Sequence, residues 1–326
     1  MPDGGHASPR CLFVVGHQGS GKTTCVDKLT AELGADRTQR IVPDELVASI
    51  DLLHGGTVEA TALREAYSRT HCATHSQRLA DHAIARRAHI VWERALPGNI
   101  ERLALAVRQL GYRVECLVLA TPVEESWLGT LRRCLAAIQA SAAHPMHVPW
   151  PLLSRTALRW PGVLDRLEQT LCIDRIAVID REGEVCFDNQ VEGPPNQRRW
   201  SDPPFAFESL MVERARPRSA TSLAALLADW EALQPQIAAI NHPNWPTQDL
   251  AAFDTHLRAL VADPASQFDL NAPNPDPAVV QAWIARLKAD LAAAERQGDT
   301  GDQPSLAARS TRLLQLVSQV AGQPTR

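Results

Sequence analysis

Residues 12–23 of the chain, LFVVGHQGSGKT, decide its fold class, because they join an apolar run to a glycine-rich turn. Leu12–Val15 is the apolar run, and it ends at Gly16. Lys22–Leu33 has the alanine and leucine content of a helix and stops at Gly34, where a helix C′ residue belongs. The sequence therefore predicts a strand, a tight turn and a helix in immediate succession.

The turn fits the phosphate-binding pattern G-x-x-x-x-G-K-[ST] at every fixed position. Glycines let backbone N–H groups curl around phosphate oxygens, and the positive end of the following helix adds to the attraction. A chance glycine-rich turn would lack this flanking strand and helix. Lys22 is expected to bridge the terminal phosphates of ATP, and the Thr23 hydroxyl to bind Mg²⁺. The residues assigned to the nucleotide are Gly16, His17, Gln18, Gly19, Ser20, Gly21, Lys22, Thr23 and Thr24.

Further along the chain, short apolar runs alternate with longer segments of helical spacing. The runs that predict strands are 40–42, 89–92, 112–120, 175–179 and 185–187. The helical segments are 61–87, 99–110 and the one opened by Pro122. This alternation is typical of parallel β/α units. We therefore predict an α/β fold, a doubly wound and mostly parallel sheet of the P-loop kinase type, with an additional all-helical C-terminal region.

The character of the chain changes after Gln190, and this change sets the expected domain boundaries. Residues 193–204 read GPPNQRRWSDPP, and 214–219 is a second polar stretch with proline. We expect a flexible N-terminus over 1–10, a kinase-type domain over 11–192, a proline-rich linker over 193–219 and a helical region over 220–326. The helical patterns in that last region are 221–240, 247–262, 277–297 and 306–321.

Composition narrows the classes of function. The chain has 326 residues, 45% of them hydrophobic, and a formal net charge of −4, so it has material for a packed core and no polyanion-binding signature. It has no apolar run of about 18 residues that predicts a membrane span. Seven scattered cysteines without a CxxC pair argue against zinc and a disulfide framework, and suit a reducing cytosol. We expect a cytoplasmic protein that binds neither nucleic acid nor membrane.

The kind of P-loop protein follows from what accompanies the turn. The chain lacks the N-K-x-D segment of a GTPase, and the strand CLVLATP at 116–122 ends without the carboxylate of a motor-type ATPase. Small-molecule kinases need a carboxylate near the acceptor hydroxyl and arginines at the transferred phosphoryl group. Asp44 and Glu93 each follow a predicted strand, where ligands of open α/β sheets bind. Asp44 suits a catalytic base and equally a helix N-cap, and Glu93 suits the site or a surface charge.

From Leu12 to about Asn189 the chain resembles the zeta-toxin family of kinases. The resemblance extends beyond the P-loop to five further stretches. They are IVPDELVASI (41–50), HSQRLADHAI (75–84), HIVWER (89–94), GYRVECLVLATPVEESWLGTLRR (111–133) and RIAVIDREGEVCFDN (175–189). The 111–133 stretch and the REG hairpin are the most specific of these.

The resemblance implies an activity and a role for each site residue. Family members phosphorylate the 3′-hydroxyl of the sugar in UDP-N-acetylglucosamine with ATP and Mg²⁺, and act as toxins that a small helical antitoxin neutralises. A related effector branch phosphorylates NAD. By position, Lys22 and Thr23 match the ATP and Mg²⁺ residues, and Asp44 matches the catalytic base. Glu93 and Asp81 match substrate-side acidic residues, and Arg133 matches the first of two phosphate-clamping arginines.

The chain also departs from the family pattern. Arg94 and Ala95 follow Glu93 where the family commonly has Gly-Thr, which changes the acceptor pocket. The second clamping arginine is missing before the helix at Pro151. The candidates to replace it are His144, His147, Arg155 and Arg159.

These departures keep two alternatives to a UDP-amino-sugar kinase open. One is a kinase of NAD or of a nucleotide, which the altered acceptor pocket suggests. The other is a weakly catalytic ATP-binding interaction module that acts through its helical tail, which the missing arginine and the long tail suggest.

Overall fold

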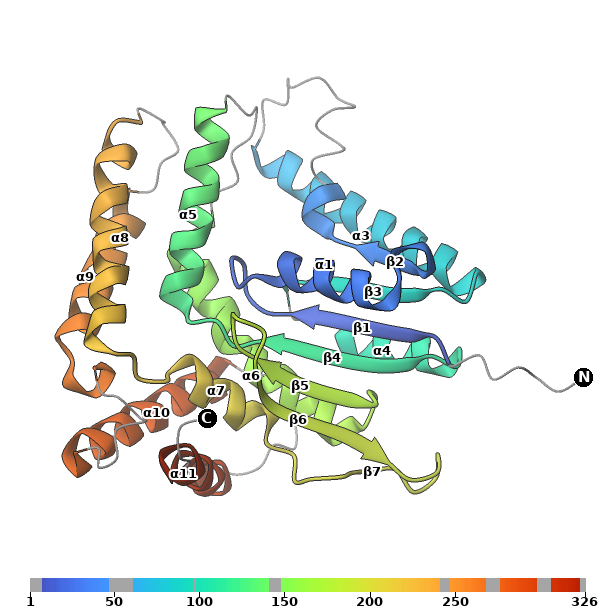
Figure 1. Cartoon of the computed structure of the whole chain (residues 1–326). Coiled ribbons are helices and arrows are strands. Elements are labelled where there is room, and N and C mark those ends of the chain that lie inside the picture. The colour runs from blue at the N-terminus through green and yellow to red at the C-terminus, as the bar shows by residue number, and fades with distance from the viewer. Residues whose placement is uncertain are drawn as a thin grey trace, which may run out of the picture.

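The computed structural model describes residues 8–46, 61–96, 98–140, 148–240, 247–267, 276–297 and 306–322. Within these residues the chain forms one seven-stranded sheet with helices on both faces and more helices beyond one end (Figure 1). Across the sheet, the strands are β2 (Thr38–Ile41), β3 (His89–Arg94), β1 (Arg10–Val15), β4 (Arg113–Leu119), β5 (Arg175–Ile179), β6 (Val185–Glu192) and β7 (Arg199–Trp200).

The sheet is mostly parallel, as the sequence predicts. Neighbouring strands from β2 to β5 run parallel, whereas β6 and β7 are added antiparallel. The first strand, β1, lies between β3 and β4, so the chain winds to one side of β1 and then to the other. Ligands of doubly wound sheets bind at this switch point, beyond the carboxyl ends of the strands. The glycine-rich turn follows β1 at that place.

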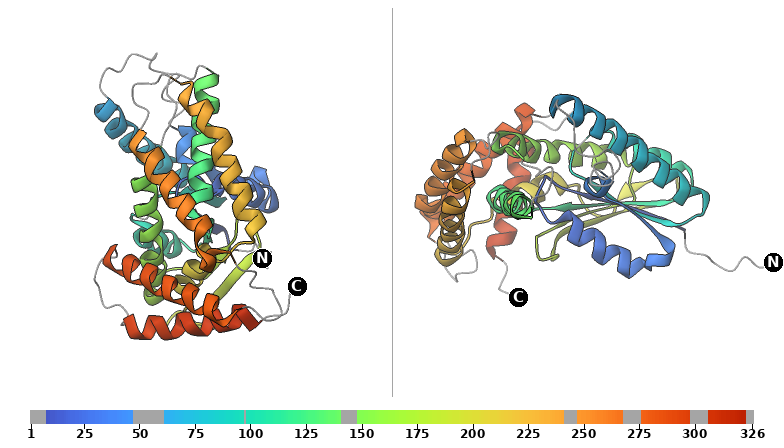
Figure 2. Two further views of the ribbon diagram at one scale, coloured as in Figure 1. Left: turned by 90° about the vertical axis from the view of Figure 1, so that its left-hand side faces the viewer. Right: turned by 90° about the horizontal axis from the view of Figure 1, so that it is seen from above.

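Alternate strand residues fill two separate cores. On one face, Leu12 and Val14 pack with Val26 of α1 (Lys22–Leu33). On the other face, Phe13 and Val15 belong to a larger core. Four helices supply that core: α3 (Thr61–Ala85), α4 (Ile100–Gln109), α6 (Trp150–Thr170) and α7 (Ala206–Arg214). Seen from above, α1 and α3 lie on opposite sides of the sheet (Figure 2). Since β1 is apolar on both faces, it is fully covered.

The C-terminal helices pack on the domain in two groups. First, α8 (Ala220–Ala238) and α9 (Thr247–Ala262) lie along α5 (Val123–Gln139), where the Trp127 and Phe253 rings are 4.4 Å apart (Figure 1). Second, α10 (Pro277–Gln297) and α11 (Leu306–Gly322) pack around α7 through Trp283 and Leu313. Two short 3₁₀ turns, η1 (Ala35–Arg37) and η2 (Pro264–Ser266), complete the described elements.

The stretch 193–219, expected as a proline-rich linker, is part of the folded domain. It contains β7, which is the edge strand of the sheet, and α7, whose Ala206 and Leu210 lie in the central core. The prolines and charges that flank these two elements hide them in the sequence, because α7 is only nine residues long. The strand predicted at 185–187 is longer in the structure, where β6 extends to Glu192 and pairs with β7.

None of the helices in the described ranges has both the length and the apolar character needed to cross a lipid bilayer.

Candidate active site

The glycine-rich turn leaves the start of α1 open to an anion. Gly21 precedes the helix in the left-handed conformation, with φ of 94°, which glycine adopts without strain. No side chain caps the helix there, and its first turn contains no acidic residue. The first N–H groups of α1 are therefore available to phosphate oxygens, which the helix dipole also attracts.

The turn is fixed against the start of α5. A Cβ atom on Gly19 would lie 2.2 Å from the Ser126 carbonyl oxygen and 2.9 Å from Thr130 Cγ2, so only glycine fits. The buried Thr121 hydroxyl donates to the Ser20 carbonyl at 2.7 Å, just before α5 begins. These contacts fix the position of the phosphate-binding turn relative to the start of α5.

Lys22, Thr23 and Glu93 form the centre of the site. Lys22 Nζ donates to the His17 carbonyl at 2.8 Å and lies 3.7 Å from Glu93 Oε1. The Thr23 hydroxyl donates to Glu93 Oε2 at 2.9 Å. Glu93 is the fifth residue of β3 and is buried, so it is an interior carboxylate and not a surface charge.

The charges of four residues act on one another at this place. Burial lowers the pKa of Lys22, while the negative charges of Glu93 and Asp44 oppose that shift and Arg133 adds to it. Burial raises the pKa of Glu93, opposed by Lys22 and Thr23 and assisted by Asp44. Asp44 and Arg133 thus act electrostatically on both buried groups.

Asp44 lies at the carboxyl end of β2, on the side of the site away from α5. Residues 43–46 are helical, so Asp44 is inside a first helical turn and is not the N-cap residue before it. Its carboxylate is exposed, and its charge also raises the pKa of Cys72 on α3. Residues 47–50, which complete the quoted IVPDELVASI stretch, lie outside the described residues.

Arg133 belongs to the face of α5 that looks at the phosphate-binding turn. Ser126 and Arg133 are seven residues apart, about two helical turns, so they lie on one side of the helix. Thr130 lies between them and contacts the position of Gly19. Arg133 is exposed, and no described residue binds its guanidinium. Its neighbour Arg132 instead pairs with Asp229 of α8 at 2.8 Å, as expected for a surface charge.

Asp81 lies apart from this group. It is exposed near the C-terminal end of α3, and its carboxylate accepts a hydrogen bond from Gln77 at 2.9 Å. It is nine residues from Cys72, about 13 Å along the helix and on the opposite side. A contact between Asp81 and substrate stays a prediction from the family resemblance alone.

None of the four candidates for the second clamping arginine is seen to contact Lys22 or Glu93 among the described residues. Arg155 and Arg159 are exposed on α6, and neither has an ion pair with a described residue. His144 and His147 lie outside the described residues. Each of the four stays a candidate.

One contact at the site could not be found by sequence reasoning. Arg214, at the end of α7, reaches the His17 ring of the phosphate-binding turn, with Nη2 at 3.2 Å from Nδ1. The two residues are 197 positions apart, and Arg214 stands in a polar stretch with no local signal of a site.

The polar groups of the site fit a nucleoside triphosphate and a magnesium ion. The uncapped α1 N-terminus and the Lys22 ammonium suit phosphate, and the Ser20 hydroxyl is buried without a partner in the described residues. The Thr23 hydroxyl and the Glu93 carboxylate supply hard oxygen ligands of the kind that Mg²⁺ prefers. A protein usually provides only a few of the ligands of a Mg²⁺ ion, and water provides the rest. Thr24, the last residue assigned to the nucleotide, is exposed in the first turn of α1.

A family model described as Zeta toxin matches residues 3–192, which is more than half of the chain and includes every group of the site except Arg214. The chain belongs to the zeta toxin family. This confirms the resemblance inferred from the sequence motifs. It matches no protein of curated function at the sequence level.

Two solved structures are similar to this zeta toxin family chain. One comes from the characterisation of the PezAT chromosomal toxin–antitoxin system of the human pathogen Streptococcus pneumoniae. It has a TM-score of 0.56 and 17% identity, over 72% of this chain and 88% of that one, which shows the shared fold. The other is the native AvrRxo1-ORF1:-ORF2 complex, with a TM-score of 0.42 and 17% identity, over 78% of this chain and 79% of that one.

Proposed function

We propose that this chain is an ATP-dependent kinase that transfers the γ-phosphate of ATP to a sugar hydroxyl of a nucleotide-linked metabolite. The observation that carries the proposal is the contact of Lys22 and Thr23 with the buried Glu93 carboxylate at the open N-terminus of α1, on which the charges of Asp44 and Arg133 also act. Two cations beside a helix N-terminus suit a triphosphate, and a carboxylate at the edge of the same site suits an acceptor alcohol.

Each residue has a defined part in the transfer. Lys22 and the α1 N–H groups hold the phosphates, and Arg133 offsets the charge that develops on the transferred group. Asp44 accepts the proton of the acceptor hydroxyl. The acceptor oxygen then forms a bond to the γ-phosphorus as the bond to the β,γ-bridging oxygen breaks, and ADP leaves. Thr23 and Glu93 would hold Mg²⁺, which would supply charge neutralisation at the phosphates.

UDP-N-acetylglucosamine is the acceptor that we place first. Its support is membership of the zeta toxin family, whose implied activity is phosphorylation of that sugar nucleotide. Action as a cytoplasmic toxin, with a small helical antitoxin as partner, is proposed on the same ground. The similarity to a structure of the PezAT toxin–antitoxin system is consistent with such a partner.

A kinase of NAD or of a nucleotide is the second candidate, because of Arg94. This arginine follows Glu93 at the end of β3 and donates to the Gly98 carbonyl at 2.7 Å. Its guanidinium lies 5.6 Å from the centre of the Trp92 ring. A cation next to Glu93 alters the charge on the acceptor side, which separates this chain from the commoner family pattern.

The experiment is a metabolite screen with the purified protein, ATP and Mg²⁺. UDP-N-acetylglucosamine, NAD and free nucleotides are supplied separately, and phosphorylated products are identified by mass spectrometry. A product that forms with wild type and is lost with Asp44→Asn supports the proposal and names the acceptor. ATP consumption with none of these metabolites, or only with polynucleotide 5′-ends, contradicts it. If Asp44→Asn keeps the cellular effect and deletion of 241–326 removes it, the chain is an interaction module.

A further inference from the structure

Arg214 is a partly buried cation that contacts the phosphate-binding turn from outside the family-matched segment. Burial lowers the pKa of its guanidinium to about 9, so it still carries a positive charge at neutral pH. Nη1 donates to the Ala157 carbonyl of α6 at 2.7 Å, and Nη2 lies 3.2 Å from His17 Nδ1. No carboxylate of the described residues forms an ion pair with it. A partly buried charge loses hydration that no ion pair replaces here, which points to a role beyond packing.

The contact fixes the protonation state of the His17 ring. A guanidinium can only donate hydrogen bonds, so Nδ1 must be the acceptor. The proton of the neutral ring is then on Nε2, which lies 2.8 Å from Ser126 Oγ and donates to it. Burial and the charges of Arg214 and Lys22 lower the pKa of His17 well below its ordinary value, in agreement with a neutral ring.

The orientation of the His17 ring also affects the phosphate-binding turn. The His17 carbonyl accepts the hydrogen bond of Lys22 Nζ, and the ring joins the turn to Ser126 on the helix that carries Arg133. A displacement of His17 would therefore change both the hydrogen bond of Lys22 and the position of the turn relative to α5.

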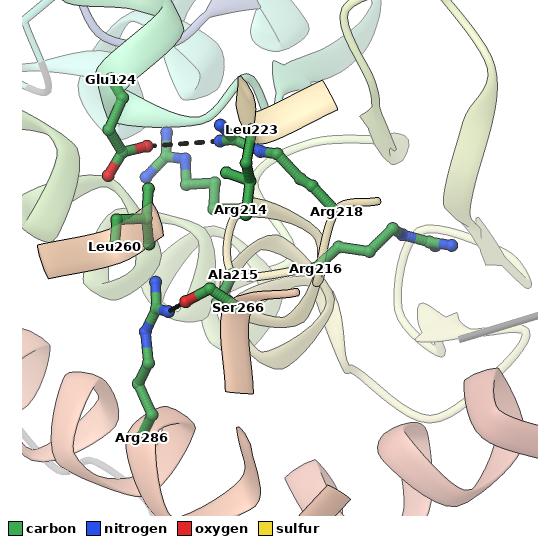
Figure 3. A pocket seen from close by; sticks show the side chains of 9 residues that line it. All are labelled: Glu124, Arg214, Ala215, Arg216, Arg218, Leu223, Leu260, Ser266 and Arg286. Atoms are coloured by element: carbon green, nitrogen blue, oxygen red, sulfur yellow. Dashed lines mark hydrogen bonds and ion pairs between the residues drawn. The ribbon is translucent and has the colours of Figure 1, made fainter. Parts of the chain in front are cut away.

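The tail helices in turn hold Arg214. Trp283 of α10 donates to the Ala215 carbonyl at the end of α7, at 2.9 Å. Arg218 pairs with Glu124 in the first turn of α5 at 3.3 Å, in the pocket that Figure 3 shows between these elements. The C-terminal helices thus set the position of α7 relative to the turn.

We propose that Arg214 is a positioning residue for nucleotide binding, through which the C-terminal helical region sets the conformation of the phosphate-binding turn. The proposal rests on the proposed function in one respect, that the ligand of the turn is ATP. Arg214 is not proposed to contact a phosphate group itself. It acts by orienting the His17 ring, which joins the turn to Ser126 of α5.

The first test measures ATP binding by calorimetry in wild type, Arg214→Met and Arg214→Lys. Methionine keeps the length and removes every donor, so ATP affinity is expected to fall roughly tenfold or more. Lysine keeps the charge without reaching both partners, and an intermediate affinity is expected. The matched control is Arg216→Met, two residues further on, whose guanidinium pairs with Glu213 on the surface; its ATP affinity should equal that of wild type.

The second test reads the His17 ring directly by ¹⁵N NMR of histidine-labelled protein. The chain has 11 histidines, so the His17 signals are identified by their absence from the spectrum of His17→Gln; in wild type they should show a single neutral form with the proton on Nε2. In Arg214→Met, we expect a mixture of the two neutral tautomers. This readout needs neither ATP nor an acceptor, so it tests the contact even if the chain proves not to be a kinase.

A double-mutant cycle closes the experiment, with His17→Gln, Arg214→Met and the double variant. If Arg214 acts through His17, the double variant binds ATP as weakly as the weaker single variant. Fully additive losses, as for independent sites, would instead mean that Arg214 only supports the fold. An Arg214→Met protein with wild-type affinity and an unchanged tautomer overturns the proposal.

Discussion

Lys22 and Glu93 form a buried ion pair, with Nζ 3.7 Å from Oε1 and neither side chain more than 6% exposed. Removing one partner of such a pair leaves an uncompensated buried charge. Lys22→Met is therefore expected to lower the free energy of unfolding by about 3 kcal/mol. The variant Lys22→Met/Glu93→Gln should regain most of that loss, because the carboxylate charge is gone.

The affinity for ATP distinguishes the role of Lys22 in binding from its role in stability. Both variants lack the ammonium, so both are expected to bind ATP roughly 10- to 100-fold more weakly than wild type. Urea unfolding and calorimetry measure the two quantities, and Lys28→Met, an exposed lysine on the same helix, is the control. If the double variant stays as unstable as Lys22→Met, the paired charge is not the cause.

Asp44→Asn should slow the transfer step without weakening ATP binding. The amide keeps the shape of the side chain but cannot accept the acceptor proton, and loss of a general base costs about 10²- to 10⁴-fold in rate. The measurement is kcat with saturating ATP, together with the Kd for ATP. Glu45→Gln is the control, since Glu45 pairs with Arg40. An equal loss in both variants would mean that the local helix, not the carboxylate of Asp44, matters.

Adjacent arginines on α5 allow a matched comparison. Arg133→Ala is expected to lower kcat by about 10³-fold, because the clamp acts on charge that develops during transfer. Arg132→Ala removes a half-exposed pair with Asp229 and should change stability by about 1 kcal/mol or less, with wild-type kcat. If kcat falls with Arg132→Ala and not with Arg133→Ala, the orientation of α5 has been read wrongly.

Glu208 on α7 predicts a pH-dependent stability. Burial raises the pKa of its carboxyl to about 7, against the charges of Arg312 and Arg309, and both carboxylate oxygens lack hydrogen-bond partners in the described residues. Between pH 4.5 and about 7, the Glu208 carboxyl keeps its proton in the folded chain, whereas in the unfolded chain, where its pKa is the ordinary 4.5, it has lost that proton. Stability should therefore fall as pH rises from 4.5 to about 7, by roughly 3 kcal/mol, and stay lower above that range.

Glu208→Gln tests this prediction, because the amide is neutral at every pH. Thermal unfolding at pH 5 and pH 8 should show a smaller loss of stability in the variant than in wild type. Glu213→Gln, on the same helix but paired with Arg216, should keep the wild-type difference. An identical pH response in wild type and Glu208→Gln would place the titrating group elsewhere.

The parts of this fold that could be predicted are those with a local pattern. The β5 strand was expected at 175–179, and the helices α9 and α10 at 247–262 and 277–297, and the structure has them at these bounds. Their apolar spacing is set by which face each element buries, so it is visible in a short window. The P-loop follows the same logic, because its glycines and lysine are contiguous.

The parts that could not be predicted depend on distant residues. The helix α7 is short and lies between proline-bearing stretches, so its burial against α6 and β5 has no local sign. Arg214 acquires its contact with His17 only when α7 docks. The role of Asp81 likewise stays a prediction from the motif, since the hydrogen bond that its carboxylate accepts comes from Gln77 on the same helix. Residue type and spacing do not specify which side of a long helix meets a site.

The placement of α7 also decides what can be excised from this chain. The family-matched segment ends at residue 192, before Ala206 and Leu210 enter the central core. The Ala206 N–H donates to the buried Glu168 carboxylate at 3.1 Å. A polypeptide cut at 192 would leave that carboxylate without its donor and open a gap over β5. The family-matched segment taken alone thus lacks side chains that belong to its own central core.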